Sequence, residues 1–204
     1  MAQAWTSDLK IWPDANELLV RRFNGTLWVV PHRIDSQHLG ELEQSLNSKG
    51  YTFERTDRAE VESTTVLKQK VRQEVRDNSI PVVLVNEMGI LLELYAHCDA
   101  VYVGGGFGEG VHSTLEPGFF GLPIACGPNK TSLFPEIRLL SEQGQLSKVT
   151  ETTELMSWIE KWGCSLFNEE TTEKREAEKN LRSDFWKSRT GESKRLTRLI
   201  QDSL

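Results

Sequence analysis

The sequence VYVGGGFGEGVHSTLEPGFFGLPIACGPN, residues 101–129, is predicted to form a strand, a glycine loop, a helix and a second strand in succession. Its first three residues are β-branched or aromatic and are followed directly by glycine, which is typical of a short buried parallel strand. Five of the next seven residues are glycine, and residues without a Cβ atom let a bound group approach the backbone. Ser113 to Glu116 then match a helix start, where free backbone N–H groups favour an anion. The stretch therefore predicts an α/β unit whose loop is suited to a phosphate.

The loop differs from two well-known phosphate-binding motifs. Its glycines are out of register with G-x-G-x-x-G, no acidic residue follows about 20 positions later, and no GK[ST] is present. What remains is a glycine loop, His112, and Glu116 one helical turn further on. A carboxylate at that distance can accept hydrogen bonds from both ribose hydroxyls while the loop holds the phosphate. The pattern favours a nucleotide that carries a sugar, although an ordinary glycine turn with a helix cap has the same residues.

Composition limits the other classes of function. The chain has 204 residues, enough for one substantial core, and a formal net charge of −6, which argues against a general affinity for nucleic acid. The three cysteines include no C-x-x-C pair, so neither a disulfide framework nor a zinc site is predicted, and a reducing cytoplasm fits best. No apolar run approaches the roughly 20 residues that span a bilayer, and the N-terminus lacks the apolar region of a signal peptide.

A metal site is not expected near the first strand. His32, Asp35 and His38 are spaced by three residues, which spreads them around a helix rather than onto the i, i+4 face of a zinc pair. We expect no metal and no cofactor in this chain. Asp35 is instead a candidate helix cap.

Residues 104–129 resemble the donor-site signature of the Kdo transferases, which move 3-deoxy-D-manno-octulosonic acid (Kdo) from CMP-Kdo to lipid A precursors. The family's usual text is a glycine loop, His-Asn, two residues, Glu-Pro or Glu-Ala, then Gly-x-Pro and Gly-Pro-(His/Asn). The positions that match are Gly110, His112, Glu116, Gly121, Pro123, Gly127, Pro128 and Asn129. Ser113 stands where Asn is usual, and the loop is the short form that lacks the arginine of many members.

The resemblance covers about residues 28–162 and implies the fold and the role. It implies an α/β fold with a Rossmann-like, doubly wound parallel sheet, the C-terminal half of a GT-B glycosyltransferase. The donor would be CMP-Kdo, and the acceptor a lipid A precursor bound by an N-terminal domain that this chain does not contain. No catalytic residue is expected here, and little transfer activity from this chain alone. The full-length protein would lie at the cytoplasmic face of the inner membrane, with a peripheral membrane contact.

The resemblance also implies which residues bind the donor. Glu116 and the backbone near Met88-Gly89 are expected to hold cytidine and ribose, as in the family text Asp-Thr-Met-Gly-Glu-Leu, although Ile90 replaces its acid. His32 and Arg33 follow a predicted strand and are expected to face phosphate or the Kdo carboxylate, with binding that weakens as a histidine loses its proton near pH 6.5. The full set of donor-binding candidates is His32, Arg33, Met88, Gly89, Gly106, Gly108, Gly110, His112, Ser113 and Glu116.

The remaining sequence alternates between strands and helices. Strands are predicted at residues 27–30, 51–55, 81–85, 101–103, 123–126 and 146–149, and helices at 15–23, 37–48, 90–97, 134–142 and 150–162. Residues 57–77 are predicted to be partly helical, and Trp5 and Trp12 to close the end of the core. Residues 1–165 thus form the predicted donor-binding domain. Residues 166–204 form a charged helical segment that packs on it or on the absent domain.

Two other functions fit the same residues. A UDP- or GDP-sugar glycosyltransferase uses the same arrangement of loop, helix and glutamate. A non-catalytic nucleotide-binding or partner-binding module is the second alternative.

Overall fold

The computed structural model describes residues 1–56, 80–167 and 172–188, and their strands form two parallel sheets. One sheet has the order β1-β3-β2, with β1 at Leu27–Val29, β3 at Ile80–Val85 and β2 at Tyr51–Thr56. The other has the order β4-β5-β6, with β4 at Val101–Val103, β5 at Ile124–Cys126 and β6 at Leu146–Lys148. In the register, Trp28 lies opposite Val83 and Tyr102 opposite Ala125.

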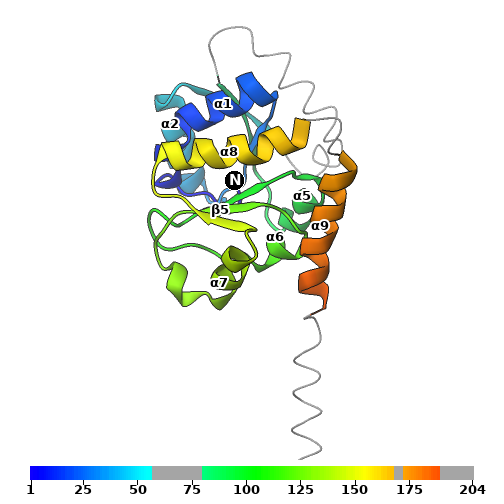
Figure 1. Cartoon of the computed structure of the whole chain (residues 1–204). Coiled ribbons are helices and arrows are strands. Elements are labelled where there is room, and N and C mark those ends of the chain that lie inside the picture. Colours follow the sequence, from blue (N-terminus) through cyan, green and yellow to red (C-terminus); the bar gives the residue numbers. More distant parts are fainter. Residues whose placement is uncertain (57–79, 168–171, 189–204) are drawn as a thin grey trace, which may run out of the picture.

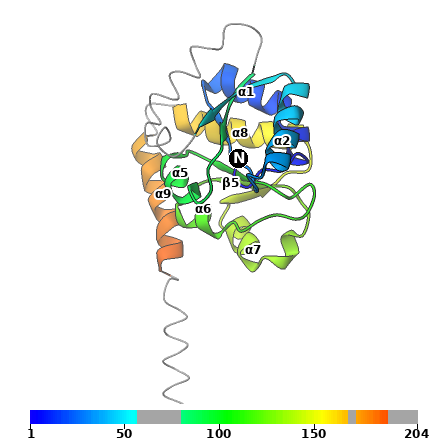
Figure 2. The same cartoon turned by 180° about the vertical axis from the view of Figure 1, so that it is seen from behind.

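The N-terminal segment joins the two sheets. Parallel bridges pair Ala2 with Val103 at β4 and Ala4 with Pro31 just after β1. The backbone N–H of Ala2 donates to the Tyr102 carbonyl at 2.8 Å, and that of Ala4 donates to the Val30 carbonyl at 2.8 Å. The N-terminus accordingly lies in the middle of the molecule (Figures 1 and 2). The strands therefore follow the spatial order β2-β3-β1, N-terminal segment, β4-β5-β6, which is a doubly wound arrangement.

Helices connect the strands. Helix α1 lies beside α8, and α9 runs along α6 (Figures 1 and 2). The described α-helices are α1 (Pro13–Phe23), α2 (Ser36–Ser48), α5 (Leu91–His97), α6 (Leu115–Phe119), α7 (Pro135–Glu142), α8 (Thr152–Phe167) and α9 (Thr172–Lys187). Short 3₁₀ helices are η1 (Asp8–Ile11) and η2 (Thr131–Leu133).

Successive side chains along a strand point to opposite faces of the sheet, so alternate residues of each strand pack into the cores on the two faces. On one face, Tyr102 and Ala125 pack with residues of α1, α2 and α8. On the other, Val103 and Cys126 pack with residues of α5, α7 and α9. Since both faces are covered, each central strand is apolar along its whole length.

The predicted fold is confirmed, with small differences at the element ends. All six predicted strands are present, and α1 begins at Pro13 because proline is suited to the first turn of a helix. Ahead of α8, which begins at Thr152, the Glu154 carboxylate accepts hydrogen bonds from the Thr150 backbone N–H and hydroxyl. The segment 57–77 lies outside the described residues.

The N-terminal segment contradicts one prediction from the sequence. Trp12 does close the core and meets Tyr102 edge-on with ring centroids 5.5 Å apart. Trp5 does not, because the strand-like pairing of residues 2–4 carries it past the carboxyl ends of β1 and β4. Its indole ring lies among histidines there.

Candidate functional site

The candidate site lies where the chain changes direction across the sheets. After the N-terminal segment, the chain builds β1, β2 and β3 on one side of that segment and β4, β5 and β6 on the other. In open parallel sheets, ligands bind at such a point, outside the carboxyl ends of the strands. His32 follows the end of β1, and the glycine loop follows the end of β4. The topology thus brings together two segments that are 80 residues apart in the sequence, from His32 to His112.

Three aromatic rings form a stack at this point. The rings of His32 and His112 are stacked with centroids 4.2 Å apart, and the ring of Trp5 is stacked on His32 at 4.8 Å. The Trp5 indole Nε1–H donates a hydrogen bond to His112 Nε2 at 3.0 Å. The backbones are fixed as well, because the His32 N–H donates to the Ala4 carbonyl at 3.1 Å and the His112 N–H to the Gly104 carbonyl at 3.3 Å. All three rings are partly exposed, so a ligand can reach them.

The shape of the glycine loop depends on two kinds of glycine. Gly105 and Gly110 have φ angles of +89° and +123°, which side chains rarely tolerate. Gly106 instead packs against the backbone of Gly127, and a Cβ atom on Gly106 would lie 2.5 Å from the Gly127 Cα. The Asn129 N–H closes this contact by donating to the Gly106 carbonyl at 3.0 Å. The loop is therefore held in one shape by the turn after β5.

The buried side chain of Asp8 holds the start of the glycine loop in place. Its side chain is fully buried, and Oδ2 accepts hydrogen bonds from the backbone N–H groups of Gly105 at 2.8 Å and Trp5 at 3.0 Å. Oδ1 accepts from the Tyr102 hydroxyl at 3.2 Å. One carboxylate thus ties the loop to the segment that carries Trp5. Burial raises the pKa of Asp8 above its ordinary value, and the backbone N–H donors oppose that shift.

Positive charge reaches the site from two directions. Lys130 folds over the loop, since a Cβ atom on Gly110 would lie 2.6 Å from its Cδ, and its Nζ donates to the Glu109 carbonyl. Arg33 follows His32 and pairs with Asp35 through Nε at 3.0 Å. Asp35 also caps α2 by accepting from the His38 N–H at 3.1 Å. Of these two side chains, Arg33 is therefore offset by a carboxylate, whereas the Lys130 ammonium is bound to a carbonyl oxygen.

The other candidates are spread along the same edge of the sheets. Met88 is 54% exposed and Gly89 has a φ of +73°, in the turn between β3 and α5. Ser113 and Glu116 are exposed at the start of α6, where the Leu115 N–H donates to Ser113 Oγ at 3.4 Å. Glu116 faces α5 closely enough that its charge contributes to the raised pKa of Tyr95, although burial of that hydroxyl is the main cause. Gly108 is exposed at the loop tip.

Both histidines of the stack are weaker bases than usual. Burial is the main cause for each, and it lowers the pKa of His112 and of His32 below 6.5. The His32 charge adds to the effect on His112, and the charges of His38 and Arg33 add to the effect on His32. In the chain without ligand, the pKa values of both rings therefore lie below the 6.5 expected from the sequence, which favours the neutral form at neutral pH.

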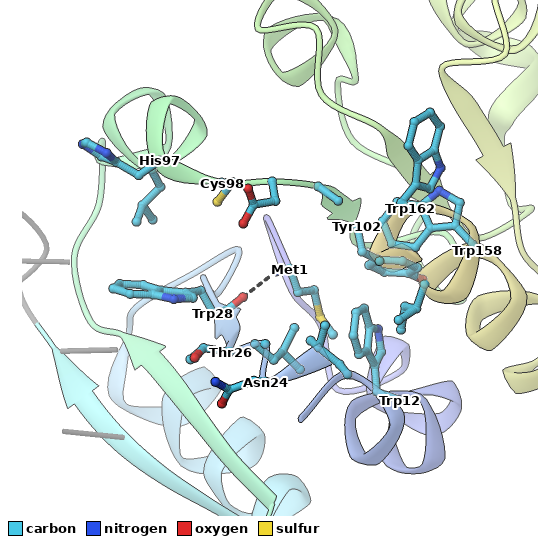
Figure 3. Close-up of a pocket in the computed structure, with 18 residues that line it drawn as sticks. Met1, Trp12, Asn24, Thr26, Trp28, His97, Cys98, Tyr102, Trp158 and Trp162 are labelled. Carbon is cyan, nitrogen blue, oxygen red and sulfur yellow. Dashed lines mark hydrogen bonds between the residues drawn. The ribbon is translucent and has the colours of Figure 1, made fainter. Parts of the chain in front are cut away.

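A cavity of about 230 Å³ lies at the opposite edge of the molecule. It is lined by residues that precede β1 and β4 and by aromatic side chains, and Figure 3 shows Trp28 and His97 at one end and Trp12, Trp158 and Trp162 at the other. None of the ten candidate residues lines it. Since ligands of such sheets bind at the carboxyl edge, we place the site at the histidine stack and not in this cavity.

Two kinds of feature are absent from the part of the chain that the structure describes. Over residues 1–56, 80–167 and 172–188, no group of three or more His, Cys, Asp or Glu side chains is placed to hold a metal ion. In the same parts of the chain, no helix combines the length and apolar character needed to cross a membrane.

The described part of the charged C-terminal segment packs on this domain. Arg182 Nε of α9 donates to the Gly121 carbonyl at 2.8 Å, and Ser183 Oγ donates to the Phe119 carbonyl at 2.8 Å. These bonds hold the turn that follows α6. The basic residues Arg189, Lys194, Arg195 and Arg198 lie outside the described residues.

Three residues of the site were not identified from the sequence. Trp5 was assigned to the core, and Asp8 and Lys130 carried no signal beyond their positions next to matched motifs. Lys130 follows directly after the matched motif Gly127-Pro128-Asn129, so its position beside the loop could have been predicted from the sequence. The role of Asp8 depends on a contact across 97 positions of the chain.

The chain is similar to known proteins in part of its sequence and in its fold. No protein-family model matches the chain. Over 55 residues, 26% of the chain, the sequence is 44% identical to a 3-deoxy-D-manno-octulosonic acid transferase of Chlamydia pneumoniae, and the match spans 13% of that protein's length.

The fold is also similar to a solved structure, the crystal structure of the C-terminal CMP-Kdo binding domain of WaaA from Acinetobacter baumannii. The TM-score is 0.60 at 18% sequence identity, over 89% of this chain and 86% of that one. The resemblance to Kdo transferases noted from the glycine loop is thus confirmed by sequence and by fold, and the chain has the Rossmann-like fold of a GT-B C-terminal domain.

Proposed function

We propose that this chain is the donor-binding domain of a Kdo transferase and binds CMP-Kdo at the carboxyl edge of its sheets. The proposal depends on one observation. The glycine loop and the His32–His112 stack lie together where the strand order changes direction across the sheets. The fold shared with a CMP-Kdo binding domain supports this choice of ligand. The enzyme would transfer Kdo to a lipid A precursor at the cytoplasmic face of the inner membrane.

The donor is assigned to the site by its chemistry. The phosphate and the Kdo carboxylate are anions, so we place them near the loop between Gly106 and Gly110, at His112 and Ser113, and near Lys130. His32 and Arg33, which follow β1, complete the part of the site that we expect to contact these anions. We place the ribose at Glu116, whose exposed carboxylate can accept from two hydroxyls, and the cytosine toward the Met88-Gly89 turn.

The chain supplies binding and stabilisation of the leaving group. As the acceptor hydroxyl attacks the anomeric carbon, negative charge develops on the departing CMP phosphate, and fixed N–H donors and a lysine stabilise it. We assign no general base to this chain. The base and the lipid acceptor would belong to an N-terminal domain, which also makes the peripheral contact with the membrane.

The base preference is tested by thermal melting. CMP at 100 times its dissociation constant should stabilise the fold by about 2.7 kcal/mol. For a chain of this size, that corresponds to a rise in Tm of roughly 5–10 °C. We expect UMP and GMP at the same concentration to give much smaller shifts. Equal shifts for all three would remove the cytidine assignment, and no shift with any of them would contradict a nucleotide site.

The phosphate position is tested with Lys130→Met, which keeps an apolar stem over Gly110 and removes the charge. Loss of a charged hydrogen-bond donor should weaken CMP binding by about 10-fold to 100-fold. Cytidine, which has no phosphate, should bind almost as it does to the unchanged chain. Calorimetric titrations with both ligands measure the difference.

Arg138→Met is the matched control for Lys130→Met. Its side chain is 82% exposed on α7 and pairs with Glu142, so the variant changes the net charge equally without touching the loop. CMP and cytidine should both bind this variant normally. An equal loss of CMP affinity in both variants would mean that only the overall charge matters.

A further inference from the structure

The hydrogen bond from Trp5 determines which nitrogen of His112 carries the proton. An indole N–H is a donor only, so His112 Nε2, which receives it at 3.0 Å, must offer a lone pair. A neutral imidazole has one protonated nitrogen, and here it must be Nδ1. We propose that Trp5 is a positioning residue that holds His112 as the neutral Nδ1–H tautomer, so that His112 meets the donor's anionic groups as a hydrogen-bond donor and not as a cation. The ligand part of this proposal rests on the proposed function.

The contacts of the ring leave Nδ1 available. The Cδ2 side of His112, next to Nε2, is turned toward Gly105, where a Cβ atom would lie 3.1 Å away. Nε2 is taken by Trp5, and the His32 ring covers one face at 4.2 Å. Within the described parts of the chain, the bond from Trp5 is the one side-chain hydrogen bond of His112, and Nδ1 makes none. His112 is partly exposed as a residue, and Nδ1 is the ring nitrogen that remains for a ligand.

Protonation of His112 has two free-energy costs in this arrangement. A proton on Nε2 would point at the Trp5 N–H, which breaks the bond between them. The second cost is burial of the ring, which is the main cause of the lowered pKa of His112, and a proton on His32 adds to it. The nearby acidic groups are already paired: Asp35 is bound to Arg33 and His38, and the Asp8 carboxylate of η1 is occupied by backbone N–H donors and the Tyr102 hydroxyl.

The same indole also organises the other histidines. Trp5 is stacked on His32 at 4.8 Å and meets His38 of α2 edge-on at 5.4 Å. Burial lowers the pKa of His32 and of His112, which agrees with two neutral rings in contact. A pair of neutral donors holds an anion with the same strength across neutral pH. A pair of imidazolium ions would lose that strength as the pH rises through 6.5.

The proposal is tested first without any nucleotide. Two-bond ¹⁵N–¹H spectra distinguish the Nδ1–H tautomer, the Nε2–H tautomer and the imidazolium, and they are recorded for the ¹⁵N-labelled chain from pH 5 to pH 8. We expect His112 to be the Nδ1–H tautomer at pH 7, with its protonation midpoint below 6.5. The signal is assigned by its loss in His112→Asn. An Nε2–H tautomer in the unchanged chain would overturn the proposal, whatever any variant of Trp5 does.

Trp5→Phe provides the second test, because it keeps an aromatic ring to stack on His32 and removes the N–H. We expect the His112 midpoint to rise by about one pH unit, since one hydrogen bond and one unit of pKa are of the same size. The Nε2–H tautomer should also appear. His97, which is exposed at the end of α5, is the internal control and should titrate unchanged. An unchanged His112 midpoint in the folded variant would contradict the role given to Trp5.

The ligand arm compares CMP affinity between the unchanged chain and Trp5→Phe at pH 6 and pH 8. The CMP phosphate also titrates in this pH range, but its titration affects both proteins equally and therefore cancels in the ratio of the two affinities. We expect the ratio to favour Trp5→Phe at pH 6 by several-fold more than at pH 8, because a larger fraction of His112 is imidazolium in the variant at pH 6. A ratio that is constant with pH would overturn the proposal. Absence of CMP binding to both proteins would contradict the proposed function, and the tautomer spectra would still decide the role of Trp5.

Discussion

Gly106→Ala is expected to lower the free energy of unfolding by about 2–3 kcal/mol, and to weaken CMP binding at least about tenfold. The new Cβ atom would lie 2.5 Å from the Gly127 Cα and 2.6 Å from its nitrogen, so two backbones must move apart. That movement also strains the bond from the Asn129 N–H to the Gly106 carbonyl. Urea unfolding and calorimetry with CMP measure the two effects.

Gly108→Ala is the control for this prediction. It makes the same chemical change two residues later, where the added Cβ would meet the Ser7 Oγ at 2.9 Å, the movable end of an exposed loop contact. We expect stability within about 0.5 kcal/mol of the unchanged chain. If both variants were equally destabilised, the packing of the loop against Gly127 would not explain the result.

Asp8→Ala is expected to have the other large effect, a loss of about 2–5 kcal/mol in the free energy of unfolding. The change leaves the buried N–H groups of Gly105 and Trp5 without an acceptor, and each such group costs about 1–3 kcal/mol. It also releases the start of the glycine loop, so CMP binding should fall in any protein that remains folded. Urea unfolding at pH 7 gives the stability.

Asp8→Asn separates the hydrogen bonds from the charge. Asn keeps an oxygen for the two backbone donors, and we expect it to be within about 1 kcal/mol of the unchanged chain at pH 7. Burial raises the pKa of Asp8, so the folded state binds the proton more tightly, and wild-type stability falls as the pH rises from 3.8 through the raised pKa. That part of the pH dependence should be missing in Asp8→Asn. A loss as large as that of Asp8→Ala would show that the charge itself is required.

The fold was largely predictable because its central strands are buried on both faces. Runs such as 101–103 and 124–126 are apolar throughout, and glycine or proline ends them, so strands of this kind can be recognised locally. The glycine loop was equally visible, since positive φ angles such as that of Gly110 restrict the residue type. The carboxyl-edge position of His32 followed from the strand before it.

The N-terminal segment was not predictable, because its structure depends on partners far away in the sequence. Ala2 and Ala4 are poor strand formers, and they pair with β4 and the end of β1 only once both sheets exist. Without that pairing, Trp5 looks like a core residue, and Asp8 like a surface carboxylate. A buried carboxylate needs donors from other elements, and nothing in the local sequence shows them. The part of the site that was missed is the part built by this segment.

The most direct test of the central claim is an amide ¹H–¹⁵N NMR titration of the chain with CMP. We expect the largest shifts to cluster in the glycine loop from Gly104 to His112 and at His32, at the carboxyl edge of the sheets. Smaller shifts are expected near Gly89 and Glu116, where the cytosine and ribose are placed. Shifts confined to the cavity at the opposite edge, around Trp28 and Trp158, would contradict the account, as would an unchanged spectrum at millimolar CMP.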